Sequence, residues 1–465
     1  MNKTKIICSI GPSCDDAKVL EKMAQNGMNV ARFNMSHGTH ESHKAMIDKI
    51  KVVREKLGVS IGIMIDTKGP EIRVRDFENG SVFLKEGDEY TLTTRDVVGN
   101  EKEVAVTYKN LPKILKKGNK ILLNDGVIEL QVKKLTNTDC VCQVMTSGTL
   151  SNHKSINIPG VKTDMPYLSE QDKADLMFAK EVDADFLSLS FVSEANDVKD
   201  VRDYLREIKF TTPLLISKIE SVDGVKNFDK ILSLSDGVMV ARGDLGVEVE
   251  FMKLPILQKE FIKKCNEQGK ISITATQMLE SMIFNKRPTR AEVSDVANAI
   301  FDGTTAIMLS GETASGNFPI ESVNTMRKIA EEMEAHLKFE PTPFKTHNTT
   351  ASIGYAVCSL AQTENVKAIN VGTKTGVTAK NVSRFRPQIP IIACTPTSKI
   401  FYQMSMLYGV IPVLEKEYKN MEEVLKHGLE HTIDTKLVES GDKIVQTGGR
   451  AGMSGSNLLM VKKIK

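Results

Sequence analysis

The strongest constraint on the fold is a repeated alternation in the sequence. A short apolar run is followed by a helical segment, and this pair recurs eight times. Such alternation is typical of βα units with parallel strands, and eight units in succession predict an α/β fold, the closed (β/α)8 TIM barrel. The predicted strands span residues 5–10, 29–38, 61–65, 184–191, 213–220, 237–241, 270–277 and 306–313.

The alternation is interrupted after the third strand. From 74 to 158 there is no long helical segment, and short alternating runs such as 90–93, 104–108 and 127–132 are separated by turn signals containing Gly, Asn and Asp. This pattern predicts a small all-β domain inserted into the barrel. We expect the insert to span 70–159.

A second α/β region follows the barrel. Glu-Pro-Thr-Pro at 340–343 is typical of a linker, and beyond it apolar runs again alternate with helical segments. The number of units is too small for a second barrel, so we expect a mostly parallel sheet. The predicted domains are the barrel (1–69 and 160–340), the all-β insert (70–159) and a C-terminal α/β domain (341–465).

Composition argues against several other classes of function. The net charge of +3, the lack of tryptophan and the aromatic content of 5% argue against a nucleic-acid partner. No apolar run approaches the ~18 residues of a membrane span, and the first strand begins too early for a signal peptide. Seven dispersed cysteines without a CxxC pair indicate reduced thiols, so we expect a cytoplasmic enzyme.

Charged residues gather where two neighbouring predicted strands end. Lys218 and Glu220 share one face of their strand, and the next strand ends in Arg242-Gly243-Asp244. An isolated Lys-x-Glu is more often a plain salt bridge. Two carboxylates at adjacent strand ends beside a lysine, however, suit a divalent cation and a phosphate.

Other patterns are weaker. Arg32, Asn34 and Ser36 alternate along one predicted strand face and favour a lined pocket. His37, His40 and His43 are spaced by three, so a metal site is conceivable, but no second ligand set accompanies them. Two glycine-rich turns, 372–378 and 447–452, could each hold a phosphate.

The strand-end motifs resemble those of the pyruvate kinase family in residue types and in order, and the similarity runs from residue 1 to the C-terminus. The position of the β insert also fits. From this sequence we expect a member without the N-terminal extension of many eukaryotic members and without the additional C-terminal domain of some bacterial ones. The motifs that carry the resemblance are ARFNMSHG at 31–38, DTKGPEIR at 66–73, SKIE at 217–220, MVARGDLG at 239–246 and ATQMLE at 275–280.

This resemblance implies transfer of the phosphoryl group of phosphoenolpyruvate to ADP, the step of glycolysis that yields pyruvate and ATP. It implies Mg²⁺ (or Mn²⁺) and K⁺ as cofactors. The residues that match the family's positions are Lys218, Arg32 and Thr276 for catalysis; Arg32, Gly243, Asp244 and Thr276 for phosphoenolpyruvate; Arg73 and Lys154 for the nucleotide; Glu220 and Asp244 for Mg²⁺; and Asn34, Ser36, Asp66 and Thr67 for K⁺.

The resemblance also implies regulation and assembly. An effector, either a sugar phosphate or a nucleotide, is expected at Thr373, Lys374, Thr375, Gly376 and Thr378. A homotetramer is expected. Glutamate at position 71 goes with dependence on K⁺ in the family, whereas lysine there goes with independence.

Two other readings stay open on sequence alone. A barrel with a lysine at a strand end could be a Schiff-base aldolase, although two nearby carboxylates would keep Lys218 charged and spoil it as a nucleophile. A non-catalytic metabolite sensor built on the C-terminal domain is the other. Borohydride trapping with pyruvate would test the first, and an assay of pyruvate formation would test the second.

Overall fold

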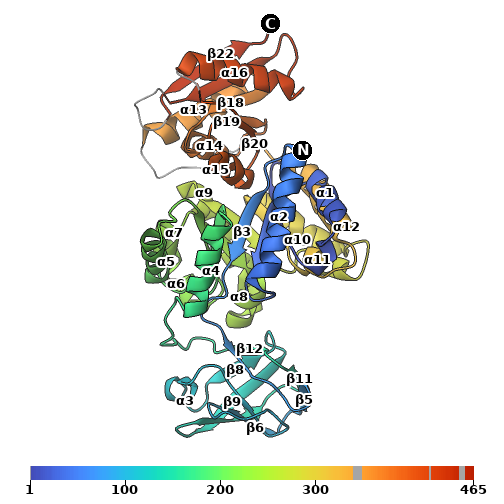
Figure 1. The fold of residues 1–465 in the computed structure, drawn as a ribbon, viewed down its shortest axis with the longest axis vertical. Helices are drawn as coiled ribbons and strands as arrows, with labels where there is room; N and C mark the ends of the chain where they lie inside the picture. The colour runs from blue at the N-terminus through green and yellow to red at the C-terminus, as the bar shows by residue number, and fades with distance from the viewer. Residues whose placement is uncertain (1, 339–347, 418–419, 450–455) are drawn as a thin grey trace.

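The computed structural model describes residues 2–338, 348–417, 420–449 and 456–465, and Figure 1 shows them as three units in a row. A barrel lies in the middle. An all-β unit lies beyond one end of it, and an α/β unit lies against the other end. The predicted linker at 340–343 falls outside the described residues.

The central unit is a closed barrel of eight parallel strands, in the order β1-β17-β16-β15-β14-β13-β3-β2. This confirms the predicted (β/α)8 fold. The strands are β1 (Lys5–Ser9), β2 (Met28–Asn34), β3 (Gly62–Asp66), β13 (Phe186–Leu189), β14 (Leu214–Ile219), β15 (Gly237–Ala241), β16 (Ile271–Ala275) and β17 (Ala306–Leu309). The helices around them are α1 (Ala17–Gln25), α2 (His40–Leu57), α4 (Glu170–Glu181), α5 (Ala195–Glu207), α6 (Val222–Lys226), α7 (Phe228–Leu234), α8 (Arg242–Glu248), α9 (Leu254–Gln268), α10 (Arg290–Phe301), α11 (Gly311–Ala314) and α12 (Pro319–His336).

Several strands end earlier than their sequences predicted. The run at 29–38 leaves the sheet after Asn34, because the His37 amide donates to the Asn34 carbonyl at 3.2 Å and closes a turn. Ser36 therefore lies in this turn and not on the strand face. The run at 306–313 is a strand only to Leu309, and the short helix α11 follows it. In both places polar residues leave the sheet at the barrel mouth.

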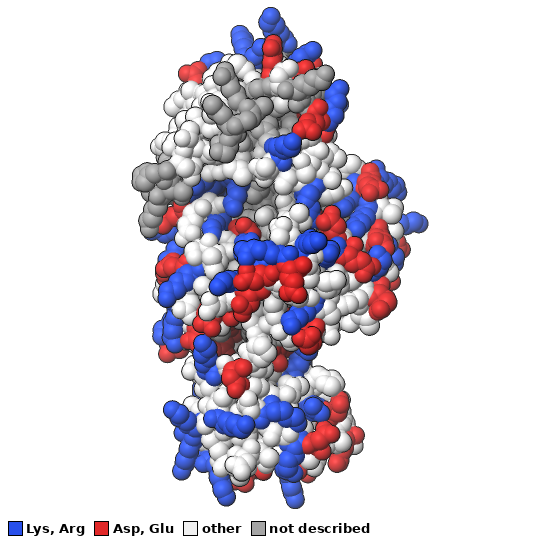
Figure 2. All heavy atoms as spheres, turned by 60° about the vertical axis from the view of Figure 1, so that its left-hand side comes forward, with Lys and Arg blue, Asp and Glu red and all other residues white. Residues whose placement is uncertain are grey.

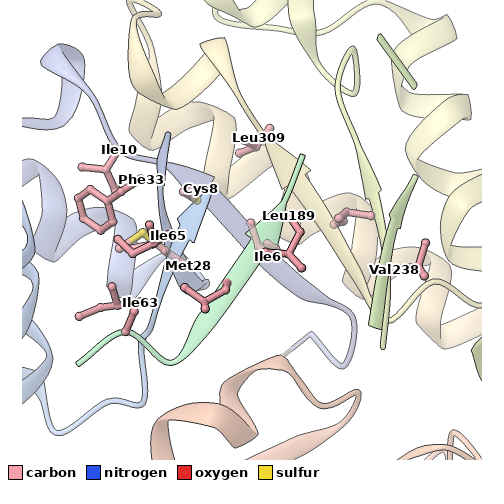
Figure 3. Packing of buried hydrophobic residues seen from close by; sticks show 14 of the residues in the cluster. Ile6, Cys8, Ile10, Met28, Phe33, Ile63, Ile65, Leu189, Val238 and Leu309 are labelled. Atoms are coloured by element: carbon pink, nitrogen blue, oxygen red, sulfur yellow. The ribbon is translucent and has the colours of Figure 1, made fainter. Parts of the chain in front are cut away.

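Alternate residues of each strand fill two separate cores. On β3, Ile63 and Ile65 point outward into the layer between strands and helices, whereas Met64 points into the barrel interior. Figure 3 shows the outer layer, where Phe33 packs near Ile65. Because side chains fill the interior, the barrel is a packed core with a site at one end and not a pore.

Local signals explain where the helices begin and end. For α2, the Thr39 hydroxyl accepts the Ser42 amide at 3.3 Å, which satisfies a free donor in the first turn. Gly58 ends this helix with φ +63°, a conformation that glycine adopts without steric cost. The Thr39 amide in turn donates to Ser42 Oγ at 3.0 Å, so two reciprocal hydrogen bonds fix the start of α2.

The inserted unit is all-β apart from one short helix, α3 (Leu111–Ile114). It contains a seven-stranded sheet in the order β4-β12-β8-β9-β10-β6-β7 and the pair β11-β5. Its own hydrophobic core is separate from that of the barrel. The strands are β4 (Ile72–Arg73), β5 (Ser81–Leu84), β6 (Glu89–Thr93), β7 (Glu103–Ala105), β8 (Lys120–Leu123), β9 (Ile128–Leu135), β10 (Asp139–Val144), β11 (Gly148–Ser151) and β12 (Ser155–Asn157).

The C-terminal unit has a five-stranded sheet in the order β20-β19-β18-β21-β22, parallel except for β22. This confirms the mostly parallel sheet. Met406, in the short 3-10 helix η4 (Met404–Met406), packs into the interior core of the barrel with Ile216 and Ile273. The elements are β18 (Ala368–Gly372), β19 (Ile391–Thr395), β20 (Val410–Leu414), β21 (Lys443–Gly448), β22 (Leu458–Lys463), α13 (Thr349–Thr363), α14 (Val377–Ser383), α15 (Ser398–Gln403) and α16 (Met421–Asp434).

Surface and thiol chemistry agree with the composition. On the face in Figure 2, Lys and Arg are interspersed with Asp and Glu and do not form one cationic field. All seven cysteines are free and buried. Within the described ranges, no helix combines the length and the hydropathy needed to cross a membrane.

Candidate active site

The carboxyl ends of four adjacent strands bring polar side chains together at one end of the barrel. On β2 and β14, the inward positions filled by Val30 and Ile216 are followed two residues later by Arg32 and Lys218. In the same way, Asp66 follows Met64 on β3. The alternation that fills the barrel interior with apolar side chains therefore ends in a charged layer at its mouth.

Asp66 is the centre of this layer and is fully buried. Its Oδ2 accepts from Arg32 Nε at 2.6 Å, and its Oδ1 lies 3.4 Å from Lys218 Nζ. Burial alone would raise the pKa of Asp66, but the Arg32 and Lys218 cations outweigh it and hold this pKa below its usual value. Arg32 also donates to Ser9 Oγ at 2.7 Å, so its guanidinium is fixed from two sides.

Lys218 joins Asp66 to Glu220. Its Nζ donates to Ser190 Oγ at 2.7 Å and lies 3.0 Å from Glu220 Oε1. Burial would lower the pKa of Lys218, but the carboxylates of Asp66 and Glu220 raise it above its usual value. An ammonium held charged in this way is a poor Schiff-base nucleophile, which argues against the aldolase reading.

The two oxygens of Glu220 have different contacts. Its Oε2 accepts the Phe191 amide at 2.6 Å, whereas its buried Oε1 faces the Lys218 ammonium at 3.0 Å. Burial raises the pKa of Glu220 to about 7; Lys218 opposes this rise and nearby Asp244 adds to it. A second carboxylate close enough to raise the pKa of Glu220 indicates a place where a divalent cation can bind between the two.

The Asp244 carboxylate lies in the first turn of α8 and has no ion-pair partner among the residues that the structure describes. The preceding Arg242 is buried and braces the next strand end, donating to the Ala275 carbonyl at 3.2 Å and to Asp295 at 2.7 Å. No cluster of three His, Cys, Asp or Glu side chains suited to a metal occurs in the described ranges. The two carboxylates therefore fit a cation that keeps water or substrate oxygens, as Mg²⁺ usually does.

Thr276 adopts a strained backbone conformation at the end of β16. Its φ is +66°, which is rare for a β-branched residue. Its Oγ1 accepts the Gly243 amide at 2.8 Å and donates to the Ala275 carbonyl at 2.6 Å. Strain that the surroundings maintain is common at functional sites. Thr276 and Gly243 thus form one rigid wall beside Asp244.

The residues expected to bind K⁺ lie at the ends of β2 and β3. Asn34 and Asp66 are partners in the β2–β3 register, and Ser36 and Thr67 lie just beyond the strands. Asn34 Oδ1 accepts the Ser36 amide at 3.1 Å, and the Thr67 carbonyl accepts from Ser190 Oγ at 2.6 Å. The structure brings these four oxygen donors to one edge of the charged layer.

The expected nucleotide contacts come from the base of the insert. Arg73 on β4 pairs with Ser155 on β12, directly after Lys154. The guanidinium of Arg73 contacts the Glu71 carboxylate at 2.7 Å. Burial raises the pKa of Glu71; Arg73 opposes this rise and Asp244 contributes to it. Glu71 therefore lies at the base of the insert, close enough to Asp244 for the two carboxylates to influence each other.

The expected effector residues lie far from this layer, in the turn between β18 and α14 of the C-terminal unit. Lys374 is exposed and pairs with Glu417 at 2.6 Å. Thr378 is buried and accepts from Ser456 Oγ at 2.8 Å. Of the second glycine-rich turn, residues 450–452 lie outside the described residues.

The three spaced histidines have other partners. His40 Nε2 lies 2.7 Å from Asp175 Oδ1, and His43 Nε2 lies 2.6 Å from the His37 carbonyl. The imidazoles of His40 and His43 therefore each have a hydrogen-bond partner that does not involve a metal ion.

Sequence reasoning missed part of the site. Ser190 links Lys218 to Asp66 and Thr67, Ser9 fixes Arg32, and the Phe191 amide holds Glu220 with φ +54°. A signal was present, because Ser9 lies two residues after inward-pointing Ile7, as Arg32 follows Val30. Continuing the pattern of inward-pointing residues past the end of every strand would have identified both Ser9 and Ser190.

Fixed cations and carboxylates without a covalent nucleophile suit the transfer of a dispersed negative charge. Fold and site together define a phosphotransferase built on a (β/α)8 barrel. The pyruvate kinase barrel-domain family matches residues 1–323, and the pyruvate kinase alpha/beta-domain family matches residues 351–462. The chain belongs to the pyruvate kinase family.

Relatives support this assignment over the whole chain. It is 44% identical to a pyruvate kinase of Staphylococcus haemolyticus, over 99% of this chain and 80% of that one. It is 43% identical to a pyruvate kinase of Clostridium perfringens, over 100% of both chains. A crystal structure of a pyruvate kinase from Cryptosporidium parvum matches with a TM-score of 0.93 and 38% identity, covering 100% of this chain and 96% of that one.

Proposed function

We propose that this enzyme transfers the phosphoryl group of phosphoenolpyruvate to ADP, giving pyruvate and ATP in the last step of glycolysis. The observation that carries this proposal is the Lys218 ammonium. It is held between Asp66 and Glu220 at the barrel mouth, beside the carboxylate of Asp244. Family membership over both matched regions gives the same reaction.

Members of this family depend on metal ions, and Glu220 and Asp244 would hold Mg²⁺ or Mn²⁺ here. The Glu220 carboxylate and the Asp244 carboxylate, which has no ion-pair partner among the described residues, are the hard oxygen ligands that such ions prefer. When bound, the ion would neutralise charge on the phosphoryl oxygens.

Arg32 and Lys218 would stabilise the phosphoryl group during transfer. Both cations are fixed before substrate arrives, Arg32 by Asp66 and Ser9 and Lys218 by Asp66, Glu220 and Ser190. Preorganised cations stabilise developing charge without reorganising during the reaction. The Gly243–Thr276 wall would position phosphoenolpyruvate. After transfer, Thr276 would help to deliver a proton to the enolate through water.

K⁺ would bind at Asn34, Ser36, Asp66 and Thr67. Glu71 would act as a nearby charge and not as a ligand, because Arg73 already occupies its carboxylate. With an acidic residue at this position, a monovalent cation must supply the positive charge that a lysine would otherwise bring.

The nucleotide would bind between the barrel and the insert. A cavity there is lined by both units, including Glu71 and Asn157 from the insert side and Glu220 and Glu248 from the barrel. Arg73 and Lys154 border this region. We therefore divide the chain into a barrel (1–69 and 160–340), a mobile lid (70–159) and a regulatory unit (341–465), and closure of the lid would exclude water.

Regulation and assembly follow from the family. A sugar phosphate or a nucleotide would bind at Thr373–Thr378, displacing Glu417 from Lys374. A homotetramer would cover the exposed apolar side chains before and in α9, where Phe251, Met252 and Ile256 are 75%, 63% and 67% exposed. We propose a cytoplasmic location, in keeping with the free thiols.

The test is pyruvate formation by the purified full chain, followed through a coupled reductase. We expect turnover that requires phosphoenolpyruvate, ADP and a divalent cation together. Omitting any one of them, or chelating the cation, should stop the reaction. Absence of pyruvate formation with all components present, in a protein shown to be folded, would overturn the proposal.

A further inference from the structure

A second polar pocket lies at the opposite end of the barrel from the active site, where the strands begin and the C-terminal unit contacts them. Figure 1 shows α14 and α15 against this end, beside α9. The barrel contributes Asn266 and Lys270, and the C-terminal unit contributes Lys380, Arg386 and Tyr408. Both units are therefore needed to form it.

The charge in this pocket is one-sided. Lys270, Lys380, Arg384 and Arg386 line it, and no Asp or Glu is among its described lining residues. In the part of the chain that the structure covers, Lys380 Nζ has neither a hydrogen bond nor an ion pair. Lys270 and Arg386 donate only to backbone carbonyls, Lys270 to Ser235 at 2.7 Å and Arg386 to Gly303 at 3.0 Å.

The nearest carboxylates are committed elsewhere. Asp236, which faces Lys380 and Lys270, pairs with Arg202 at 3.0 Å. Glu334, which faces Arg386, accepts the amides of Lys3 and Thr4. Burial lowers the pKa of Lys380 and Arg386, and lowers that of Lys270 to about 8. The pocket thus holds more positive than negative charge in a buried place, which is unfavourable.

Two buried donors in the pocket are also unused. Arg386 stacks on the Tyr408 ring at 3.6 Å, and Tyr408 is only 1% exposed. Arg386 Nη2 and the Tyr408 hydroxyl are both buried and have no hydrogen-bond partner within the described ranges. Buried polar groups in proteins are nearly always paired, so these donors point to a ligand with acceptor oxygens.

We propose that this pocket binds the phosphate group of a small phosphorylated metabolite, or free inorganic phosphate. Lys380 Nζ, Arg386 Nη2 and the Tyr408 hydroxyl would donate to its oxygens, with Arg384 and Lys270 adding charge. The site differs from the Thr373–Thr378 turn, which lies at the other end of α14. Because its lining comes from both units, a bound phosphate would tie the C-terminal unit to the barrel.

Calorimetric titration of the full chain tests this, in phosphate-free buffer without divalent cations, with inorganic phosphate and with ribose 5-phosphate as probes. We expect Lys380→Met to weaken binding about tenfold or more, as loss of a charged hydrogen bond predicts. Lys380→Arg should retain it. Every protein compared here, by calorimetry or by unfolding, also carries Lys374→Met, because the Thr373–Thr378 turn would otherwise bind the same probes. The matched control is Lys367→Met, the same change at an exposed lysine of the C-terminal unit, and it should leave affinity unchanged.

Thermal unfolding gives a second readout of the same binding, through the stabilisation that a bound ligand brings. Phosphate should raise the unfolding temperature of the native chain but not that of Lys380→Met. Without phosphate, Lys380→Met should be at least as stable as the native chain, because an unpaired buried charge is gone. Much tighter binding of ribose 5-phosphate than of phosphate identifies a metabolite as the ligand; equal or weaker binding identifies phosphate. Native affinity in Lys380→Met, or lost affinity in Lys367→Met, overturns the proposal.

Discussion

At the scale of single residues, the active site is a balance of charges fixed before any substrate binds. Asp66 is held by Arg32 and Lys218, and Lys218 by Asp66 and Glu220, and all four side chains are nearly or fully buried. Removing one member therefore leaves its partners unpaired in a region of low dielectric, where such a loss is costly. The Asp244 carboxylate is the exception, because it has no ion-pair partner among the residues that the structure describes, and it marks where an ion is expected.

Lys218→Met should lower kcat by at least a hundredfold, about 2.7 kcal/mol of transition-state stabilisation, and change KM for phosphoenolpyruvate little. The reason is that a fixed cation at this place acts mainly on the charge that develops during transfer. Steady-state kinetics measure both constants. Lys230→Met, the same change at an exposed lysine on α7, is the control and should behave like the native enzyme. A kcat within about tenfold of native would contradict the assigned role.

Glu71→Lys should weaken activation by K⁺, because an ammonium at this place can supply the charge that the ion brings. Activity is measured against K⁺, Na⁺ and a bulky organic cation at constant ionic strength. The native enzyme should respond strongly to K⁺ and little to Na⁺. Glu71→Gln removes the negative charge without adding a positive one, and it should keep the requirement. Full native activity with the organic cation alone would disprove the K⁺ site.

At the scale of elements, the joints between barrel and insert differ in rigidity. Gly69 has φ +68°, its amide donates to Asp172 Oδ1 at 2.9 Å, and a Cβ there would lie 2.7 Å from the Ser190 carbonyl oxygen. Gly160, at the other crossing, has φ +74° and open space around it. The first joint is thus packed against the active site, whereas the second is free to move.

Gly69→Ala and Gly160→Ala form a matched pair that separates strain from packing. Each should cost roughly 1–2 kcal/mol for an L-residue in the left-handed region. Gly69→Ala should cost a further 1–3 kcal/mol or so, because the added methyl group meets the Ser190 carbonyl. It should also lower kcat, since Ser190 holds Lys218. Urea unfolding and steady-state kinetics test this, and equal effects of the two changes would contradict it.

A carboxyl between barrel and insert should make stability depend on pH. Burial raises the pKa of Glu248 to about 7, and Asn157 of the insert donates to it at 3.4 Å. Since the folded state holds this proton more tightly than the unfolded chain, stability is lost as pH rises from about 4.3 to 7. Glu248→Gln should therefore stabilise the protein more at pH 8 than at pH 5.5, by roughly 1–2 kcal/mol.

Chemical denaturation at the two pH values measures this difference. Glu250→Gln, at a neighbouring exposed glutamate paired with Lys253, is the control and should show no such dependence. A stabilisation by Glu248→Gln that does not change with pH would mean that the proton is not held there.

Most elements followed from the sequence because apolar periodicity is a local property. The strand that carries Lys218 and Glu220 and the order of the barrel units could be predicted in this way. The ends of the strands could not be predicted in this way. Ser36 lies outside β2 because the backbone there forms a turn, closed by the hydrogen bond from the His37 amide to the Asn34 carbonyl, and does not continue the sheet. The partners of Asp66 depend on strands far apart in sequence, and so does the pocket at Lys380, which no local pattern indicates. The domain boundaries stay a prediction.

At the scale of the whole molecule, the barrel and the C-terminal unit share a core. Met406 enters the barrel interior beside Ile216 and Ile273. Other contacts support it: Lys5 Nζ donates to the Val410 carbonyl at 2.7 Å, and the Gly409 amide donates to the Lys3 carbonyl at 2.9 Å. The insert, by contrast, has a hydrophobic core of its own. The two ends of the barrel therefore differ: one shares a core with its neighbour, and the other meets a unit with a separate core, as the proposed lid movement requires.

Met406→Ala should destabilise the barrel by about 2–5 kcal/mol, the usual range for truncating a buried methionine. Met404→Ala is the control, because Met404 is equally buried but packs in the core of the C-terminal unit. Hydrogen exchange should show faster opening of β14 and β16 in the first variant and not in the second. Identical exchange profiles would show that the barrel interior does not need this side chain.

The position of Met406 also bears on how the chain is made. A ribosome releases the N-terminus first, and β1 can pair with β2 at once, but its other neighbour, β17, is synthesised much later. Even after β17 has emerged, the barrel interior stays unfilled at the end that faces the C-terminal unit until η4 is synthesised. The nascent barrel must therefore wait for a later part of the chain, and its apolar interior is a natural target for chaperones during that interval.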